Sequence, residues 1–257
     1  MPDIALPGLR MHFERAGKGV PLLLIPGALG TGAGDFPAQI GWFAERGFEV
    51  IAPDPRGYGR SRPPERDYPP DFYDRDAADM FALMAALGHE QFHVLGWSDG
   101  ANIAAIMAAE HRGRVGKLVV FGGQSFLTAE EIAAFNDIRS ISAWSPRAAE
   151  AMRAVYGDGL DGLWDRYVDG QVALFEAGGN LYRERLARIR CPAFVLHGAL
   201  DPLVPAFHAE AIHRGIAGSR LHIFPTGKHN IHIRYAGEFN DRVHAFLTDP
   251  LTRPDLR

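Results

Sequence analysis

The pentapeptide GWSDG at residues 96–100 is the part of the sequence best suited to chemistry. A Gly-x-Ser-x-Gly pattern indicates a nucleophilic serine when it forms a tight turn between a strand and a helix. The two glycines favour such a turn because they carry no side chain. A short apolar segment, 92–97, leads into the pattern, and an apolar helical segment, 99–111, follows it. We therefore predict that Ser98 attacks a carbonyl carbon from the N-terminus of a buried helix.

A nucleophilic serine needs a base, and the base needs a carboxylate that orients it. Asp201 follows the strand-like segment 193–198, and His229 follows the segment 220–225. Each could have a plain structural role, as a turn former or a helix cap. However, the order serine, acid, histidine at three strand ends would bring all three residues to one edge of a parallel sheet. We predict a catalytic triad of Ser98, Asp201 and His229.

Acyl transfer also needs N–H donors that stabilise an oxyanion. One predicted donor is the backbone N–H of Asp99, directly after the nucleophile. The second should come from the glycine-rich loop PGALGTG, residues 26–32, which follows the strand-like segment 21–26. Ala28 and Leu29 are both candidates, and the sequence does not distinguish them.

The negative charge of Asp99 lies beside this predicted oxyanion. Two like charges about 6 Å apart repel by roughly 3 kcal/mol at an effective dielectric of about 20, which slows attack by about two orders of magnitude. The helix N-terminus offsets part of this repulsion. A substrate ammonium could offset the rest, because an α-amino group is only two bonds from the carbonyl carbon. Alternatively, Asp99 is a first-turn helix acid whose side chain points away.

Short apolar segments alternate with helical patterns along most of the chain. This alternation predicts a doubly wound, mostly parallel α/β sheet. The predicted strands are 9–13, 21–26, 48–53, 92–97, 117–122, 193–198 and 220–225, and the clearest helices are 71–88, 99–111 and the stretch with an apolar stripe from Ala236 to Phe246.

Residues 123–189 interrupt this alternation, since they are helical in pattern, rich in aromatic residues and without strand signals. An insertion between parallel strands emerges at their carboxyl ends, where ligands bind. We predict a helical lid over 123–189 and a core made of 1–122 and 190–257. The simpler alternative is an ordinary helical layer on the sheet.

The composition limits the possible partners. The chain has 257 residues, a formal net charge of −4 and a single cysteine, which excludes an intramolecular disulfide. Without a basic run or a long apolar segment, we expect a cytoplasmic protein with neither a nucleic-acid nor a membrane partner. His232, three residues after His229, has no third ligand at a suitable spacing, so we expect no metal and no cofactor; His197 is expected to be structural. The oligomeric state remains open.

Several segments resemble the α/β-hydrolase family. DPRGYGRS at 54–61 is similar to that family's D-x-R-G-x-G-x-S loop. Over about residues 9–247 the chain resembles the valacyclovir hydrolase (biphenyl hydrolase-like) branch, through PGALG, DPRGYGRSRPPERDYP, LGWSDG, HGALDPLVPAFHAEAIH and GSRLHIFPTGKHNIHIRYAGEFN. The resemblance implies an α/β-hydrolase fold and hydrolysis of α-amino acid esters, including valacyclovir-type prodrugs, through an acyl-enzyme. It also implies the triad named above, with Asp99 recognising the substrate amine. Ala101 departs from the glycine expected after the pentapeptide.

Other activities are compatible with parts of this pattern. Carbon–carbon (meta-cleavage product) hydrolases also use serine, but their substrates are anionic and Asp99 would repel them. A general carboxylesterase with a perhydrolase side activity would need only the triad and the oxyanion donors. A non-catalytic binding protein would be expected to lack part of the triad, and every member is present here.

Overall fold

The computed structural model describes residues 2–111 and 113–250. In this part of the chain, eight strands form one sheet in the order β1-β2-β4-β3-β5-β6-β7-β8. The pairs β1–β2 and β2–β4 are antiparallel, and all the others are parallel. This confirms the predicted doubly wound, mostly parallel sheet. The strands are β1 Asp3–Leu6, β2 Leu9–Gly17, β3 Val20–Ile25, β4 Phe48–Pro53, β5 Phe92–Trp97, β6 Val115–Phe121, β7 Ala193–Gly198 and β8 Arg220–Phe224.

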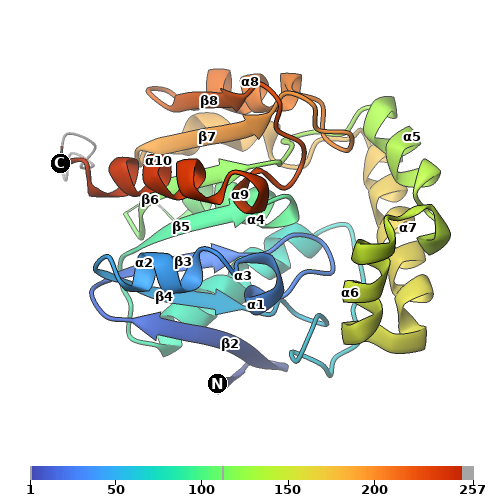
Figure 1. Ribbon diagram of the computed structural model, residues 1–257, viewed down its shortest axis with the longest axis horizontal. Helices are drawn as coiled ribbons and strands as arrows, with labels where there is room; N and C mark the ends of the chain where they lie inside the picture. The colour runs from blue at the N-terminus through green and yellow to red at the C-terminus, as the bar shows by residue number, and fades with distance from the viewer. Residues whose placement is uncertain (1, 112, 251–257) are drawn as a thin grey trace.

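Helices cover both faces of the sheet (Figure 1). One face carries α3 Phe72–Ala86, α4 Asp99–Glu110 and α8 Phe207–Gly215, and the other carries α1 Gly32–Asp35, α2 Ile40–Ala44, α9 Ile231–Arg234 and α10 Ala236–Thr248. Alternate residues of the central strands belong to two separate apolar clusters, one on each face. Because both faces are covered, β7 is buried along its whole length. Burial on both faces explains why these strands are continuous apolar segments in the sequence.

A helical insertion joins β6 to β7. It comprises α5 Ala129–Asp137, η1 Ile141–Ala143, α6 Pro146–Tyr156, η2 Gly157–Gly159, α7 Leu160–Glu176 and η3 Arg183–Arg188. Figure 1 shows α5, α6 and α7 grouped at one end of the sheet, on the side to which β6 leads. Thr128 and Glu131 form a capping box at the start of α5. Glu131 also accepts a 2.7 Å hydrogen bond from His208 of α8, which anchors the insertion to the core. Its role as a lid stays a prediction.

Across residues 2–111 and 113–250, no helix combines the length and the apolar character needed to cross a bilayer.

Candidate active site

Ser98 lies at a strained turn between β5 and α4. Its φ of 55° and ψ of −121° place it in the left-handed region, which residues with a side chain rarely adopt. The flanking glycines allow this turn: a Cβ on Gly96 would lie 2.1 Å from the carbonyl oxygen of Gly100, and a Cβ on Gly100 would lie 2.0 Å from that of Ile25. Such strain persists only where the surroundings enforce it. The turn therefore presents the Ser98 hydroxyl at the carboxyl edge of the sheet.

The structure brings Ser98, His229 and Asp201 into hydrogen-bonding distance. His229 Nε2 lies 3.1 Å from Ser98 Oγ, and His229 Nδ1 lies 2.7 Å from Asp201 Oδ2. The other oxygen of Asp201 accepts hydrogen bonds from the N–H groups of Leu203 and Val204, at 2.9 and 3.1 Å. If Nδ1–H donates to the carboxylate, Nε2 is free to accept the serine proton, which is the arrangement a general base requires.

Neighbouring contacts fix the two loops that carry the acid and the histidine. Trp97, inside the pentapeptide, donates its indole N–H to the carbonyl of His229 at 3.0 Å. The N–H of Leu200 donates to the carbonyl of Gly227 at 2.8 Å, which ties the Asp201 loop to the His229 loop. The sequence shows Trp97 only as the variable residue of the motif. The structure shows that it holds the histidine loop against the serine turn.

Electrostatics favour a charged Asp201 and a basic His229. Burial alone would lower the pKa of His229, but the neighbouring Asp201 carboxylate outweighs it and the pKa is raised above its usual value. Burial would likewise raise the pKa of Asp201, yet the nearby His229 and the hydrogen bonds to the carboxylate lower it. The imidazole is therefore strengthened as a proton acceptor by the carboxylate that orients it.

Three backbone N–H groups near Ser98 are available for an oxyanion. Within the described residues, the N–H groups of Ala28, Leu29 and Asp99 donate to no protein acceptor. Leu29 also has a positive φ of 59°, which it shares with Ser98 alone among the described non-glycine residues. The structure thus keeps both loop candidates, and their assignment as donors stays a prediction.

Asp99 points into the protein, towards α3 and the helical insertion. Its side chain is buried, with 5% of the residue exposed, and Oδ1 accepts hydrogen bonds from the hydroxyls of Tyr73 at 2.6 Å and Tyr167 at 3.1 Å. Gln171 in turn donates to the Tyr73 hydroxyl at 3.0 Å. Oδ2 has no hydrogen-bond partner in the described part of the chain. A buried carboxylate with one unpartnered oxygen can accept from a cationic donor.

Among the described residues, the hydrogen-bond donors to the Asp99 carboxylate are neutral hydroxyls, and no cation pairs with it directly. Burial raises the pKa of Asp99 to about 6, and the tyrosine hydroxyls only partly oppose this rise. The buried guanidinium of Arg66 lowers that pKa, but Arg66 is engaged with Asp76 through two hydrogen bonds of 2.8 and 2.6 Å. Asp76 acts on Asp99 in the opposite direction. When Asp99 is ionised, the surrounding charges therefore do not fully neutralise its negative charge.

Sequence reasoning did not identify the partners of Asp99. Tyr73 extends the apolar stripe of α3 by one turn, because it precedes Ala77 by four residues. Tyr167 and Gln171 are also four residues apart, so they share one face of α7. A hydroxyl or amide group on a buried helix face needs a hydrogen-bond partner. The sequence therefore indicates that these side chains form hydrogen bonds, but it does not identify Asp99 as their acceptor.

Two other histidines near the site have structural contacts. His197 is buried, and its Nε2 lies 2.8 Å from the carbonyl of Val204. His232 is packed among aromatic rings, and its Nε2 lies 2.9 Å from the carbonyl of Asp35, while burial lowers its pKa to about 3. The Asp35 side chain accepts from the N–H of Gly27 at 3.0 Å, and burial raises its pKa to about 7.

Comparison with known proteins identifies the class. Residues 20–155 match the family model for the alpha/beta hydrolase fold. The chain belongs to this family, and its sheet order and serine turn agree with that assignment. It is similar to the human serine hydrolase BPHL, with 44% identity over 95% of this chain and 85% of the human protein. The chain is therefore a serine hydrolase related to BPHL.

More distant relatives share the fold. A 2-hydroxy-6-oxononadienedioate/2-hydroxy-6-oxononatrienedioate hydrolase of Escherichia coli K12 is 28% identical over 94% of this chain and 92% of its own length. The solved structure of a meta-cleavage product hydrolase from Pseudomonas fluorescens has a TM-score of 0.79 and 21% identity, and covers 96% of this chain and 97% of its own. At that identity the structural likeness shows the fold alone.

Proposed function

We propose that the protein hydrolyses carboxylic esters of α-amino acids through a seryl acyl-enzyme. Ser98 Oγ attacks the ester carbonyl while His229 Nε2 takes its proton, and Asp201 holds the imidazole in the reactive orientation. The N–H of Asp99 and an N–H of Ala28 or Leu29 stabilise the oxyanion. His229 then protonates the departing alcohol, and water attacks the acyl-enzyme with His229 again as the base.

The observation that carries the substrate class is the buried carboxylate of Asp99 directly after the nucleophile. An α-ammonium group would supply the missing positive charge, bind Asp99 Oδ2, and bring the ester carbonyl next to Ser98. Valacyclovir-type prodrugs belong to this substrate class. The 44% identity to BPHL supports a shared reaction class. Asp99 opposes the alternative reaction on meta-cleavage products, because those substrates are anionic and would approach a carboxylate that already lacks a counter-ion.

The wild-type protein should prefer an α-amino ester to its des-amino analogue. We expect kcat/KM for L-valine benzyl ester to exceed that for benzyl isovalerate by between about tenfold and a hundredfold, because one charge-assisted hydrogen bond contributes roughly 1.5–3 kcal/mol. The two esters have the same leaving group and differ only in the α-amino group. Each kcat/KM is divided by the rate of uncatalysed hydrolysis of the same ester, because an α-ammonium group by itself makes the carbonyl more reactive. Equal values would favour a general carboxylesterase, and cleavage of a meta-cleavage product with neither ester accepted would overturn the proposal.

The two esters should also differ in their dependence on pH. The pKa of Asp99 is about 6 in the free protein, and the amine is bound only when this carboxyl is ionised. His229, whose pKa is raised, must be neutral to act as a base. For the amino ester, log kcat/KM should therefore fall with a slope approaching about two on the acid side, since both groups must lose a proton. For the des-amino ester the slope should stay near about one.

This pH experiment needs a check on stability. Protein held at each acidic pH and returned to neutral buffer should recover full activity. A slope of about one for both esters would contradict a role for the ionised Asp99 in binding.

A further inference from the structure

Hydrogen bonds fix the loop at residues 26–32 through the N–H groups of three of its glycines. Gly27 donates to Asp35 Oδ2 at 3.0 Å, Gly30 donates to the carbonyl of Gly27 at 3.1 Å, and Gly32 donates to Asp54 Oδ1 at 3.0 Å. Leu29 lies between these anchored glycines with its positive φ of 59°. A left-handed conformation costs a residue with a side chain roughly 1–2 kcal/mol. Leu29 therefore needs a contact that keeps its peptide in place.

That contact comes from the helical insertion. The hydroxyl of Tyr156, the last residue of α6, donates to the carbonyl oxygen of Leu29 at 2.6 Å. The same hydroxyl accepts from the N–H of Gly59 at 3.2 Å, in the turn that follows β4. Because the Gly59 N–H uses the oxygen as its acceptor, the single hydroxyl proton is directed to Leu29. Burial raises the pKa of Tyr156 well above its usual value, so this proton is retained throughout the physiological range.

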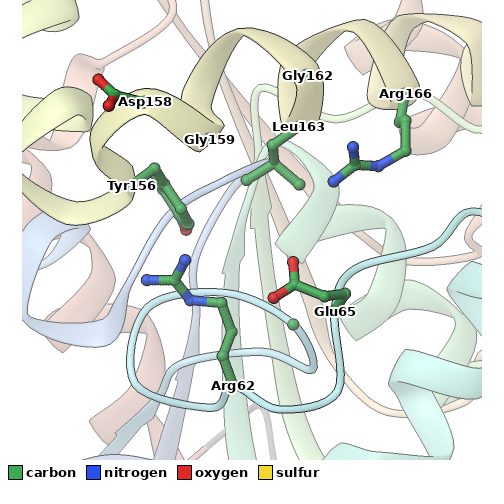
Figure 2. Close-up of a pocket in the computed structure, with 9 residues that line it drawn as sticks. Arg62, Glu65, Tyr156, Asp158, Gly159, Gly162, Leu163 and Arg166 are labelled. Carbon is green, nitrogen blue, oxygen red and sulfur yellow. The ribbon is translucent and has the colours of Figure 1, made fainter.

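The ring of Tyr156 is held by packing as well as by this hydrogen bond, because the residue is buried and belongs to the apolar cluster that includes residues of α3 and α4. The ring borders a cavity of about 270 Å³ at the junction between the insertion and the core (Figure 2). Arg62 lies against the ring, with its guanidinium carbon 4.9 Å from the ring centre, and also donates to the carbonyls of Gly59 and Val155. Figure 2 shows Arg62 and Tyr156 on one side of the cavity and Arg166 and Glu65 on the other.

We propose that Tyr156 is a positioning residue for the oxyanion hole, which makes the helical insertion part of the catalytic apparatus. Fixing the carbonyl of Leu29 fixes the peptide plane on its C-terminal side, and together with the left-handed φ this sets the direction of the neighbouring N–H groups. An oxyanion donor acts only when it is aligned in advance. This inference rests on the serine mechanism proposed above, but it does not depend on recognition of an amine.

The test is the Tyr156→Phe variant, which removes the hydroxyl and keeps the ring. With p-nitrophenyl butyrate we expect kcat to fall by between about tenfold and thirtyfold while KM stays within about twofold, because the oxyanion forms only after binding. The inhibition constant of butaneboronic acid should rise by a similar factor, since its tetrahedral adduct with serine places an oxygen in the oxyanion hole. Thermal unfolding should show that the variant is folded.

Arg166→Met is the matched control. Arg166 lines the same cavity from α7, on the side away from Tyr156, so its replacement alters the insertion but leaves the hydrogen bond from Tyr156 to Leu29 available. We expect it to keep kcat and the boronate inhibition constant near the wild-type values. The inference is overturned if Tyr156→Phe keeps wild-type kcat, if it lowers kcat without weakening the boronate, or if Arg166→Met reproduces both effects. Activity that survives removal of the Ser98 hydroxyl would instead overturn the proposed mechanism itself.

Discussion

The Ser98→Ala variant should lose about 10⁵–10⁶-fold in kcat for any ester that the wild-type protein cleaves, because removing the nucleophile of a serine triad eliminates the covalent route. The measurement is the steady-state rate with p-nitrophenyl butyrate, together with labelling by a fluorophosphonate probe. The wild-type protein should carry the label on Ser98, and the variant should carry none. The variant should remain folded, since the strained turn is set by the flanking glycines and the backbone.

Ser125→Ala is a suitable control for this experiment. Ser125 is also buried, and its hydroxyl has no hydrogen-bond partner in the described residues, so its removal should leave the rate and the label unchanged. Retention of more than about one hundredth of the wild-type rate in purified Ser98→Ala protein would exclude Ser98 as the nucleophile.

The Asp99→Asn variant should slow hydrolysis of the amino ester but not of its des-amino analogue. With L-valine benzyl ester, kcat/KM should fall by between about a hundredfold and a thousandfold, because the buried ammonium would lose the charge that compensates it. With benzyl isovalerate, kcat/KM should stay unchanged or rise by up to about tenfold, because a negative charge next to the oxyanion is removed. Asparagine keeps an oxygen that can accept from Tyr73 and Tyr167, so these two side chains should stay in place.

The control for Asp99→Asn is the double variant that also carries Tyr167→Phe. If the Asp99 carboxylate binds the substrate amine directly, adding Tyr167→Phe to Asp99→Asn should change kcat/KM for the amino ester only modestly, because the charge that binds the amine has already been removed. An equal loss with both esters in the Asp99→Asn variant would show that the residue supports the serine turn and does not recognise the amine.

The sequence was sufficient to predict the fold and the three residues of the proposed triad. The segments 48–53, 92–97 and 193–198 coincide with β4, β5 and β7, because strands buried on both faces must be continuously apolar. The predicted strand 117–122 extends earlier in the structure, to Val115 in β6. The sequence analysis missed β1, which is only four residues long, partly exposed and paired on one side alone. Its apolar signal is correspondingly weak.

The side chains that surround Asp99 could not be predicted in the same way. Asp201 and His229 follow strands, so the topology of a parallel sheet is enough to place them near Ser98. Tyr167 reaches Asp99 across 68 residues of sequence, and Gln171 reaches Tyr73 across 98. These contacts depend on how the insertion folds back over the sheet, which no local pattern determines. The left-handed Leu29 is unpredictable for a similar reason, since only its surroundings enforce that conformation.

The catalytic residues and the hydrogen-bond partners of Asp99 come from different parts of the chain. Ser98, Asp201 and His229 all lie on loops of the sheet, whereas Tyr167 and Gln171 belong to α7 of the insertion. On the proposed mechanism, substitutions on α7 should therefore alter which acyl groups are accepted without disturbing the hydrogen bonds among Ser98, His229 and Asp201. Tyr156 is the exception within the insertion, because its hydroxyl donates a hydrogen bond to the carbonyl of Leu29 in the loop that carries the predicted oxyanion donors. Related enzymes should therefore differ in substrate preference through substitutions on α7, whereas a substitution of Tyr156 at the end of α6 should lower the catalytic rate.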